Sequence, residues 1–308
     1  MHYIKGIEAY KNENRSAVTL GKFDGFHRGH MMLVNRVQQL ASENNIHSIV
    51  CSFDMRPLFK RTNSNAKLLM TSDERKRKLS DKVDYFIDCP FTKELSMMEA
   101  EAFIEKVLVE TFHAAYVVVG EDFCFGHGKR GNRYMLAEYA EKYGYELIVY
   151  EQERYNGRII SSTYTKEALM EGNMSLVREL LGYPYTFTGT VTHGNKIGRE
   201  IGVPTMNIVP NEWKMMPPNG VYFNRVRIDG VWYNAIGNVG VKPTVMDSDQ
   251  VVVESFLLDY MGNAYDKDVI IELYEYRRPE KKFSNIEEMK LTIIKDIAAG
   301  REYFKNLK

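Results

Sequence analysis

Short apolar runs alternate with segments of helical periodicity from the N-terminus to about Leu181, and no other feature restricts the fold of this chain as strongly. The runs AVTLGKF, HSIVCSF, VDYFIDC, AAYVVVG and YELIVYE have the length and composition of buried strands. Between them, MMLVNRVQQLASEN and SMMEAEAFIEKVLVETF have apolar residues at helical spacing. In the second, the expected apolar stripe consists of Met98, Ala102, Ile104 or Glu105, and Leu108 or Val109. This alternation predicts a doubly wound α/β fold, a parallel sheet with helices on both faces.

The pattern changes near Leu181-Gly182, where the helical period stops and polar–apolar alternation begins. Strands are expected in TFTGTVTH, GVYFNRVRIDGVWYNAIGNVG, QVVVESFLLDY and DVIIELYEYR, and the IDG within the second predicts a hairpin turn. A closing helix is expected in SNIEEMKLTIIKDIAAGREYFKNL, with Ser284 or Asn285 as its N-cap. The sequence therefore predicts two domains: residues 1–183 with the α/β fold, and residues 184–308 with an antiparallel β-barrel and a terminal helix.

The composition excludes several classes of protein. The 308 residues include 41 Lys+Arg and 41 Asp+Glu, and this balance argues against a nucleic-acid binder. The three cysteines are widely spaced without a C-x-x-C motif, so reduced thiols are expected. The N-terminus lacks the apolar core of a secretory signal, and no apolar run approaches the roughly 18 residues of a membrane span. We therefore expect a cytoplasmic protein without a nucleic-acid or membrane partner. We also expect it to be a monomer or a weak homo-oligomer.

The sequence GKFDGFHRGH links the first expected strand to the first expected helix and carries two histidines three positions apart. Ligands bind at the carboxyl ends of parallel strands, and a helix N-terminus offers unpaired N–H groups to phosphate. Gly21, Gly25 and Gly29 allow close approach of the backbone to a ligand. His27 and His30 can donate hydrogen bonds to phosphoryl oxygens, so a nucleotide site is expected. A surface turn is the alternative; a zinc site would need a cysteine partner or third ligand that is not evident.

The full spacing G-x-x-D-G-x-H-x-G-H resembles the nucleotidyltransferase superfamily with the H-x-G-H signature. More narrowly, the chain resembles the bacterial bifunctional riboflavin kinase/FMN adenylyltransferase (FAD synthetase) family, whose motifs it matches in order over nearly its whole length. The segments SFDMRP, LLMTSDERKRKLS, VVVGEDFCFGHGKRGN and GRIISSTYTKEALMEG resemble further family segments. The resemblance implies that His27 and His30 are catalytic. It also implies that ATP is bound by the first motif, at Gly21, Phe23, Asp24, Gly25 and Gly29.

The segment GEDFCFGHGKRG is a glycine-rich loop that follows the fourth expected strand. Its Asp122 can orient a substrate hydroxyl, and Phe123 and Phe125 can stack on a flat ring. By the resemblance, these residues and Asn132 bind FMN. The alternative is a mobile surface loop without a ligand.

The segment ISSTYTK precedes an expected helix. Ser161, Ser162 and Thr163 can cap that helix, and they can also offer hydroxyl and N–H groups to the phosphates of ATP. The family usually reads S-S-T-R-x-R here, whereas this chain has Tyr164 and Lys166. Lys166 remains a cation for phosphate but lacks the forked contact of an arginine. This departure is expected to weaken adenylyl transfer.

The stretch TGTVTHGNKIGREIGVPTMNIVP carries glycines at four-residue intervals and no Walker motif. By the resemblance to flavokinases, its ATP-binding residues are Gly194, Lys196, Gly198, Gly202 and Pro204. Thr205 and Asn207, two positions apart in an extended strand, point to the same face, and their oxygens suit Mg²⁺. From the residues alone, a polar strand face is the commoner explanation. The resemblance implies that Thr205 and Asn207 hold the magnesium of ATP.

Glu254 lies inside the otherwise apolar run VVVESFLL. The resemblance implies that it is the general base at the primary hydroxyl of the riboflavin ribityl chain. A solvated strand residue is the alternative. In YEYRRPEKKF, Arg277 or Arg278 is expected to contact flavin or phosphate.

The resemblance implies an enzyme of FAD biosynthesis that uses ATP and Mg²⁺. The barrel would phosphorylate riboflavin to FMN, and the α/β domain would adenylylate FMN to FAD with release of pyrophosphate. Two alternatives stay open: only one activity is retained, with the adenylyltransferase weakened by Tyr164, or the chain is a non-catalytic flavin-sensing regulator.

Overall fold

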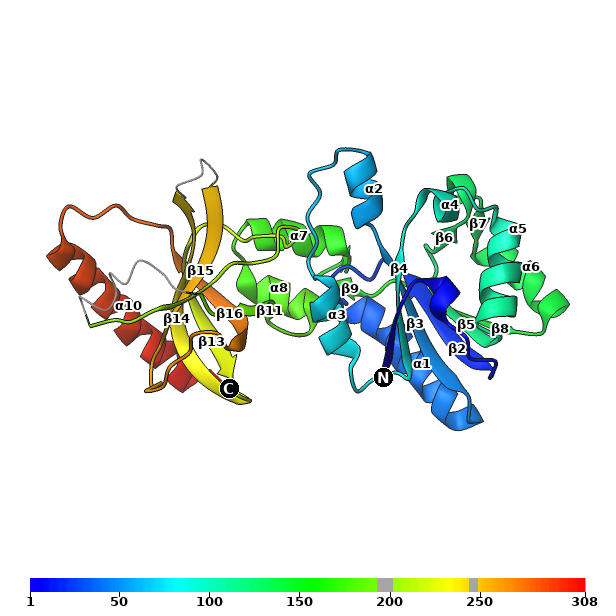
Figure 1. Cartoon of the computed structure of the whole chain (residues 1–308), viewed down its shortest axis with the longest axis horizontal. Helices are drawn as coiled ribbons and strands as arrows, with labels where there is room; N and C mark the ends of the chain where they lie inside the picture. Colours follow the sequence, from blue (N-terminus) through cyan, green and yellow to red (C-terminus); the bar gives the residue numbers. More distant parts are fainter. Residues whose placement is uncertain (193–201, 244–248, 308) are drawn as a thin grey trace. The chain divides into compact units, whose positions relative to one another are not determined.

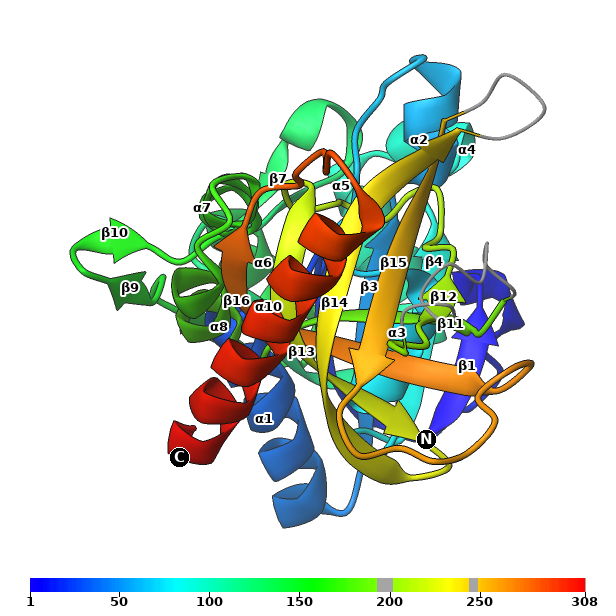
Figure 2. The same ribbon diagram turned by 90° about the vertical axis from the view of Figure 1, so that its left-hand side faces the viewer.

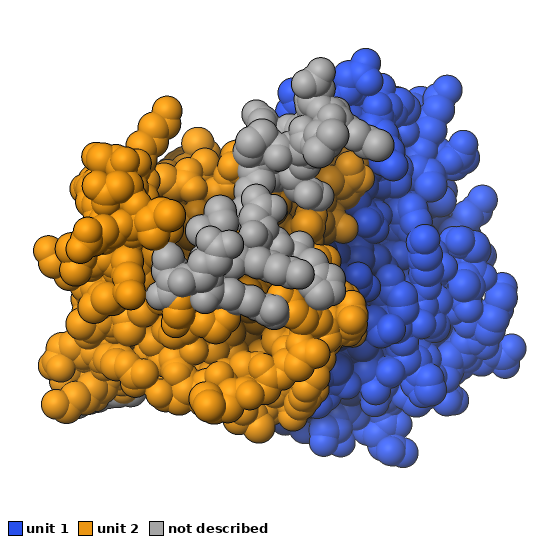
Figure 3. Space-filling model, turned by 60° about the vertical axis from the view of Figure 1, so that its left-hand side comes forward, with its two compact units in different colours: residues 1–162 blue, residues 163–308 orange. Residues whose placement is uncertain are grey.

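The computed structural model of the chain describes residues 1–192, 202–243 and 249–307 (Figure 1). The chain forms two compact units, residues 1–162 and residues 163–308, which Figure 3 colours separately. No helix in the described ranges is long and apolar enough to cross a membrane.

The first unit is built on a six-stranded sheet in the order β1-β4-β3-β2-β5-β8, and all its strand pairs are parallel. The strands are β1 (His2–Lys5), β2 (Ser16–Gly21), β3 (His47–Asp54), β4 (Tyr85–Pro90), β5 (Ala114–Gly120) and β8 (Glu146–Tyr150). The chain runs from β2 to β3 and β4 on one side and returns at β5 on the other. This reversal places a switch point beside the carboxyl end of β2.

Helices cover both faces of this sheet, as the alternating pattern predicts. They are α1 (Arg28–Asn44), α2 (Arg56–Arg61), α3 (Ser72–Leu79), α4 (Lys93–Ser96), α5 (Ala100–Phe103), the π-helical η2 (Ile104–Thr111) and α6 (Arg133–Tyr143). Strand residues such as Val18 and Ile49 pack in one cluster with α5 and η2. α1 covers the opposite face, where it contacts β2, β3 and β5.

The apolar stripe of the α5–η2 segment differs from the expected one. Its buried residues are Ala100, Phe103, Ile104, Val107 and Leu108. Ile104 and Leu108 were expected, but Met98 lies before α5 and Ala102 is only partly buried. The observed i, i+3, i+4, i+7, i+8 pattern has a wider apolar face than the expected stripe.

Several short elements were not expected from the sequence. They are β1, the 3₁₀ turns η1 (Ile7–Ala9) and η3 (His127–Lys129), and the two-residue strands β6 (Cys124–Phe125), β7 (Gly131–Asn132), β9 (Arg154–Tyr155) and β10 (Arg158–Ile159). β6 pairs with β7, and β9 with β10. β1 has only four residues at the edge of the sheet, too few for a periodic signal.

The second unit contains a six-stranded antiparallel sheet in the order β11-β16-β13-β14-β15-β12. Its strands are β11 (Tyr185–Thr190), β12 (Met206–Ile208), β13 (Gly220–Ile228), β14 (Val231–Pro243), β15 (Asp249–Leu257) and β16 (Asp268–Arg278). The sheet curls so that its edges meet: Thr192, just after β11, forms an antiparallel bridge with Asn207 of β12. The Thr192 N–H donates to the Asn207 carbonyl oxygen at 2.8 Å. The sheet thus has the predicted antiparallel barrel form as a curled half-barrel, and this bridge connects its two edges.

The terminal helix α10 (Ile286–Asn306) lies across one face of this sheet (Figure 2). Of the two predicted N-cap residues, Asn285 is the one observed, and its side chain accepts a hydrogen bond from the Glu288 N–H. The expected hairpin joins β13 to β14 through Asp229 and Gly230, both with positive φ.

The compact units divide at a different place from the predicted domains. Helices α7 (Ser162–Met170) and α8 (Met174–Leu181) precede the predicted boundary at 183/184, yet α8 packs against β11 and β16. The buried residues of α8 are Met174, Val177, Leu180 and Leu181. This apolar face ties α8 to the barrel, and the units therefore divide at 162/163.

Candidate active sites

The two histidines meet at the N-terminus of α1, directly after β2. His27 is the N-cap of α1, and its Nδ1 accepts a hydrogen bond from the His30 N–H at 3.4 Å. The two imidazole rings stack, with centroids 3.5 Å apart and planes at 21°. The structure thus places the predicted pair together at the switch point of the sheet, where open α/β sheets bind ligands.

Burial keeps both imidazoles neutral near pH 7. His27 is 6% exposed, and burial lowers its pKa to about 4. Burial, and secondarily the charge of His27, lowers the pKa of His30 well below its ordinary value. Because Nδ1 of neutral His27 accepts a hydrogen bond, its proton lies on Nε2. His27 can therefore donate from Nε2 to a ligand oxygen without carrying a charge.

The loop between β2 and α1 has an unusual backbone. Phe23, Gly25 and Phe26 have φ values of 44°, 94° and 37°. The Phe23 and Phe26 rings stack at 5.2 Å between centroids, and the Phe23 ring meets the His30 ring edge-on at 5.2 Å. Phe23 is 1% exposed, so its side chain offers almost no surface to ATP. Its ring packs against the His30 ring and supports it.

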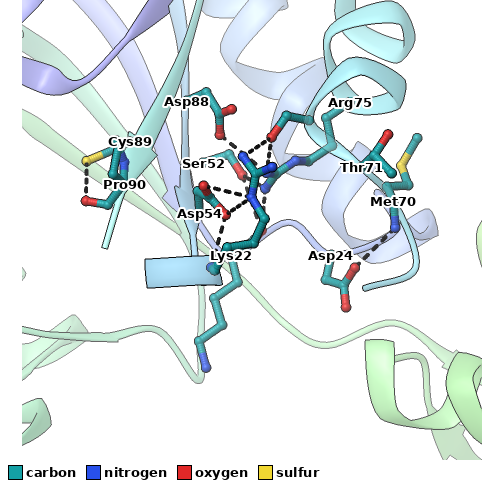
Figure 4. A network of polar contacts seen from close by, with 12 residues as sticks. Lys22, Asp24, Ser52, Asp54, Met70, Thr71, Arg75, Asp88, Cys89 and Pro90 are labelled. Atoms are coloured by element: carbon teal, nitrogen blue, oxygen red, sulfur yellow. Dashed lines mark hydrogen bonds and ion pairs between the residues drawn. The ribbon is translucent and has the colours of Figure 1, made fainter. Parts of the chain in front are cut away.

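Asp24 links this loop to two other segments. Its Oδ1 accepts hydrogen bonds from the backbone N–H groups of Leu69 at 2.7 Å and Met70 at 3.3 Å. Its carbonyl oxygen accepts a hydrogen bond from the Ser162 hydroxyl at 2.8 Å. Figure 4 shows Asp24 facing Met70, just before α3. Asp24 thus fixes the loop in place, a role that the motif alone did not reveal.

Ser162 is the residue of the ISST segment that this loop holds. Ser161 immediately precedes α7 and Ser162 begins it, while Thr163, Tyr164 and Lys166 belong to the second unit. The predicted contacts of these residues with ATP remain predictions.

The predicted FMN loop follows β5 and is only partly exposed. Asp122 is exposed and Phe123 is partly buried, whereas Phe125 is 6% exposed and packs on Phe103 in the core. The rings of Phe123 and Phe125 stack at 5.6 Å between centroids. Little of the Phe125 ring is therefore available to a flavin, and it serves as the base on which Phe123 lies.

Asn132, the remaining predicted FMN ligand, is the N-cap of α6. Its Oδ1 accepts hydrogen bonds from the N–H groups of Tyr134 at 2.9 Å and Met135 at 3.2 Å. This capping accounts for an asparagine at this position without a ligand.

A buried polar network at the carboxyl ends of β3 and β4 was missed from the sequence (Figure 4). Arg75 of α3 and Asp88 of β4 are each 2% exposed and form an ion pair at 3.2 Å. Nearby, the Arg56 Nε donates to both oxygens of Asp54, at 2.8 and 3.0 Å. The one available signal was Asp88 within the apolar run YFIDC, a position where an unpaired carboxylate would be costly.

In the second unit, three polar residues form a row across neighbouring strands. Asn207 of β12 lies directly opposite Glu254 of β15, and Glu254 lies directly opposite Asn238 of β14. Directly opposed residues of antiparallel strands place their side chains on the same face of the sheet. The structure therefore brings the predicted metal ligand Asn207 beside the predicted base Glu254 and adds Asn238, which was not predicted.

This row continues an apolar face that α10 covers. Two residues along each strand from Asn238 and Glu254 lie Ile236 and Phe256, which are directly opposite each other. Ile236 is also opposite Phe223 of β13, and all three pack with Ile297 and other residues of α10. The polar row begins where this apolar patch ends. Asn207 is 5% exposed and Glu254 is partly buried. Glu254 is therefore not an ordinary solvated strand residue.

Other groups surround the row. Asn238 Nδ2 donates to Glu280 Oε1 at 2.9 Å. Thr205 immediately precedes β12, and Gly202, with a φ of 79°, precedes Pro204. Gly194, Lys196 and Gly198 lie outside the described residues. Pairing between β12 and β15 is a long-range contact, so only the spacing of Thr205 and Asn207 was readable in the sequence.

Both arginines predicted to contact flavin lie at an aspartate of α10. Arg278 donates to Asp296 Oδ2 from Nε at 3.0 Å and Nη2 at 2.7 Å. The Arg277 Nε is 3.9 Å from Asp296 Oδ1, and the side chain of Arg277 is 43% exposed. Arg278 therefore ties β16 to α10, whereas Arg277 retains surface for a ligand.

The metal-binding chemistry of the described residues rests on oxygen donors. Within the described ranges, no cluster of three or more His, Cys, Asp or Glu residues is arranged to hold a metal. The Thr205 hydroxyl and the Asn207 amide oxygen are hard donors next to the Glu254 strand. This donor set fits Mg²⁺, which takes few protein ligands and keeps waters and phosphates.

Comparison with known proteins assigns a different family model to each part of the chain. The FAD synthetase model matches residues 9–164, and the riboflavin kinase model matches residues 181–304. These two ranges contain the histidine pair and the Asn207–Glu254–Asn238 row, respectively.

Similar proteins match along the whole chain. The bifunctional riboflavin kinase/FMN adenylyltransferase of Buchnera aphidicola subsp. Schizaphis graminum is 34% identical, over 99% of this chain and 99% of the relative. The protein of the same name from Listeria monocytogenes is 32% identical, over 100% of this chain and 98% of the relative. A crystal structure of a Streptococcus pneumoniae protein described as a macrolide-efflux protein is 27% identical, with a TM-score of 0.85, over 100% of this chain and 99% of that one.

The two family models together cover most of the chain, and the full-length relatives share one name. This chain belongs to the family of bifunctional riboflavin kinases/FMN adenylyltransferases.

Proposed function

We propose that the two sites catalyse two successive steps of FAD formation. The site in the second unit transfers the γ-phosphoryl group of ATP to riboflavin, and the site in the first unit transfers AMP from a second ATP to the FMN produced. The observation that carries this proposal is the match of two family models to separate stretches, each of which contains one of the two polar sites.

In the adenylyl step, an oxygen of the FMN phosphate attacks the α-phosphorus of ATP. A new P–O bond forms to the α-phosphorus, and the bond from the α-phosphorus to the bridging oxygen of pyrophosphate breaks. Neutral His27 donates from Nε2 to a phosphoryl oxygen on which charge develops, and His30 stacks against it. Asp24 and Phe23 hold the histidines in place, while Gly21, Gly25 and Gly29 leave room for the nucleotide.

In this proposal, the leaving pyrophosphate lies near the N-terminus of α1 and near Ser161 and Ser162. Ser161 and Ser162 offer hydroxyl groups to it. Thr163 and Lys166 stay ATP ligands that the family resemblance predicts. Tyr164 stands where the family usually has an arginine, so we expect this chain to bind pyrophosphate more weakly than a chain with that arginine. FMN binds at Asp122 and Phe123, with Phe125 and Asn132 supporting the loop from the core and from the start of α6.

In the kinase step, Glu254 accepts the proton of the ribityl primary hydroxyl as that oxygen attacks the γ-phosphorus of ATP. A new O–P bond forms to the γ-phosphorus, the bond from the γ-phosphorus to the bridging oxygen of ADP breaks, and ADP leaves. Asn207 and Asn238 flank Glu254 in register and restrict where its carboxylate can lie. Thr205 and Asn207 would hold Mg²⁺, which when bound neutralises phosphate charge. The stretch proposed to bind ATP contains Gly194, Lys196, Gly198, Gly202 and Pro204. Arg277, whose side chain keeps exposed surface, is proposed to contact the flavin or its phosphate.

The experiment that tests this function is a product chromatogram of purified protein incubated with riboflavin, ATP and Mg²⁺. The proposal predicts FMN first and then FAD. If riboflavin is converted only to FMN, and supplied FMN is not converted to FAD, the protein has the kinase activity but not the adenylyltransferase activity. Flavin binding without either product would instead support a flavin-sensing regulator. We further propose a cytoplasmic protein that acts as a monomer or weak homo-oligomer.

A further inference from the structure

The loop that carries the histidine pair needs outside support. Three residues between Lys22 and His27 have positive φ, and two of them, Phe23 and Phe26, are not glycine. Such a backbone persists only where its surroundings hold it. Asp24 is held by the backbone ahead of α3 and by Ser162. The start of the loop, at Lys22, is held by a second and separate set of contacts.

That second set centres on the guanidinium group of Arg75 (Figure 4). Its Nη1 donates to the Ser52 hydroxyl oxygen at 2.7 Å and reaches the Lys22 carbonyl oxygen at 3.4 Å. The Ser52 hydroxyl donates to the same carbonyl at 3.2 Å. Because the Ser52 oxygen accepts from Arg75, its own hydrogen is directed at Lys22. Arg75 thus acts on Lys22 both directly and through Ser52.

The position of Arg75 is itself fixed by buried charge. Its Nη2 donates to Asp88 Oδ1 and to the Ser72 hydroxyl oxygen, each at 3.2 Å. The other oxygen of Asp88 accepts from the Tyr3 hydroxyl at 3.0 Å. Burial and then the neighbouring Asp88 raise the pKa of Tyr3 to about 12, so this donor keeps its proton. Ser52 is fully buried and Arg75 and Asp88 are 2% exposed, so water does not compete with these contacts.

The network leaves one group unsatisfied. The Arg75 Nε is buried and, among the described residues, has no hydrogen-bond acceptor. A charge buried at this cost is weak as a source of stability, because an apolar residue of similar size often replaces such a pair without loss. Because Arg75 makes defined contacts with a strained loop, we infer that it serves to fix the position of that loop rather than to stabilise the fold.

We propose that Arg75 is a positioning residue of adenylyl transfer, which sets the His27–His30 pair by holding the Lys22 carbonyl directly and through Ser52. This inference rests on the proposed function of the first unit. It adds a residue outside the H-x-G-H motif whose effect on the reaction passes through the loop backbone. Arg75 does not touch the reacting atoms in this account.

The test compares Arg75→Met, Arg75→Lys and Ser52→Ala with Arg77→Met, a matched control on the exposed side of the same helix. FAD formation from FMN and ATP is measured in each full-length variant, with FMN formation from riboflavin as an internal measure of intact second units. We expect Arg75→Met to lower kcat for FAD formation about ten- to a hundredfold, with KM for ATP changed less than about threefold. Ser52→Ala gives a smaller loss, and Arg75→Lys recovers part of the activity.

A second readout follows the histidines without catalysis. The ¹⁵N chemical shifts of His27 Nδ1 and Nε2 report its tautomer and cap bond, and we expect them to move in Arg75→Lys and Ser52→Ala but not in Arg77→Met. Equal kcat and unchanged imidazole shifts in folded Arg75→Lys and Ser52→Ala would overturn the inference, even if Arg75→Met fails to fold. If the wild-type protein makes no FAD from FMN, the proposed function fails, and unchanged imidazole shifts would still refute positioning by Arg75.

Discussion

At the scale of residues, each site depends on a side chain whose chemical role is set by its surroundings. His27 is neutral because it is buried at the start of a helix, where a positive charge would also face the helix dipole. Glu254 stands between two asparagine residues on neighbouring strands, a place where a carboxylate can be oriented but not easily displaced. Neither environment follows from the identity of the residue alone.

Replacing Glu254 by Gln should abolish most FMN formation. The amide keeps the shape of the side chain but cannot accept the proton of the ribityl hydroxyl, so we expect kcat to fall by about 10²- to 10⁴-fold. Flavin binding should be unchanged, as measured by fluorescence titration. Glu275→Gln, at an exposed position of β16, is the control. Equal turnover in Glu254→Gln would contradict the role of Glu254 as general base.

The stability of the first unit should fall as the pH is lowered from 6.5 toward 4. The folded-state pKa of His27 is about 4, below the 6.5 of the unfolded chain, so the unfolded state binds more protons in this window and stability rises with pH. The contribution of His27 is on the order of 3 kcal/mol. Hydrogen exchange of β2 and α1 peptides measures it.

The matched variant for this measurement is His27→Asn, which retains a capping oxygen but does not titrate. Its pH dependence should be flatter than that of the wild-type protein over the same window. Parallel curves for the two proteins would contradict the prediction, because they would show that the pKa of His27 is the same in the folded and unfolded states.

At the scale of elements, the sequence indicated the strands well and their partners poorly. The strands β2, β3, β4, β5 and β8 coincide with predicted apolar runs, and the hairpin at Asp229-Gly230 follows from its turn residues. The Asn207–Glu254–Asn238 row depends on pairing between strands far apart in the chain, which local periodicity does not encode. The contribution of α8 to the second unit was missed for the same reason.

The β2–α1 loop offers a test of how an element positions a residue. Asp24→Ala removes the acceptor for the Leu69 and Met70 N–H groups, and we expect FAD formation to fall about tenfold or more. Asp24→Asn retains an acceptor oxygen and should keep most of the activity. Rates of FAD formation from FMN measure both variants. Equal activity in Asp24→Ala and the wild-type protein would show that the loop does not need this anchor.

At the scale of the whole molecule, the two units carry separate chemistry in one chain. Each has its own core and carries one of the two proposed sites, and each contains most of the stretch that one family model matches. The product of one site is the substrate of the other. Nothing in the proposed chemistry requires that one chain perform both steps on the same flavin.

A mixture of two single-site variants should therefore restore the complete reaction. His27→Asn retains the kinase and Glu254→Gln retains the adenylyltransferase, so together they should convert riboflavin to FAD through free FMN, with a lag that shortens as protein concentration rises. Chromatography of the flavins over time measures the lag. Absence of FAD from the mixture, with each retained activity intact, would contradict independent sites.

The central claim is that ATP is cleaved at two different bonds by two different sites. The most direct test incubates the full-length protein with riboflavin, Mg²⁺ and ATP labelled with ³²P at either the α- or the γ-phosphorus, followed by separation of the flavins. The account predicts γ-label in both FMN and FAD, and α-label in FAD alone. Absence of α-label from every flavin, or α-label in FMN, would contradict it.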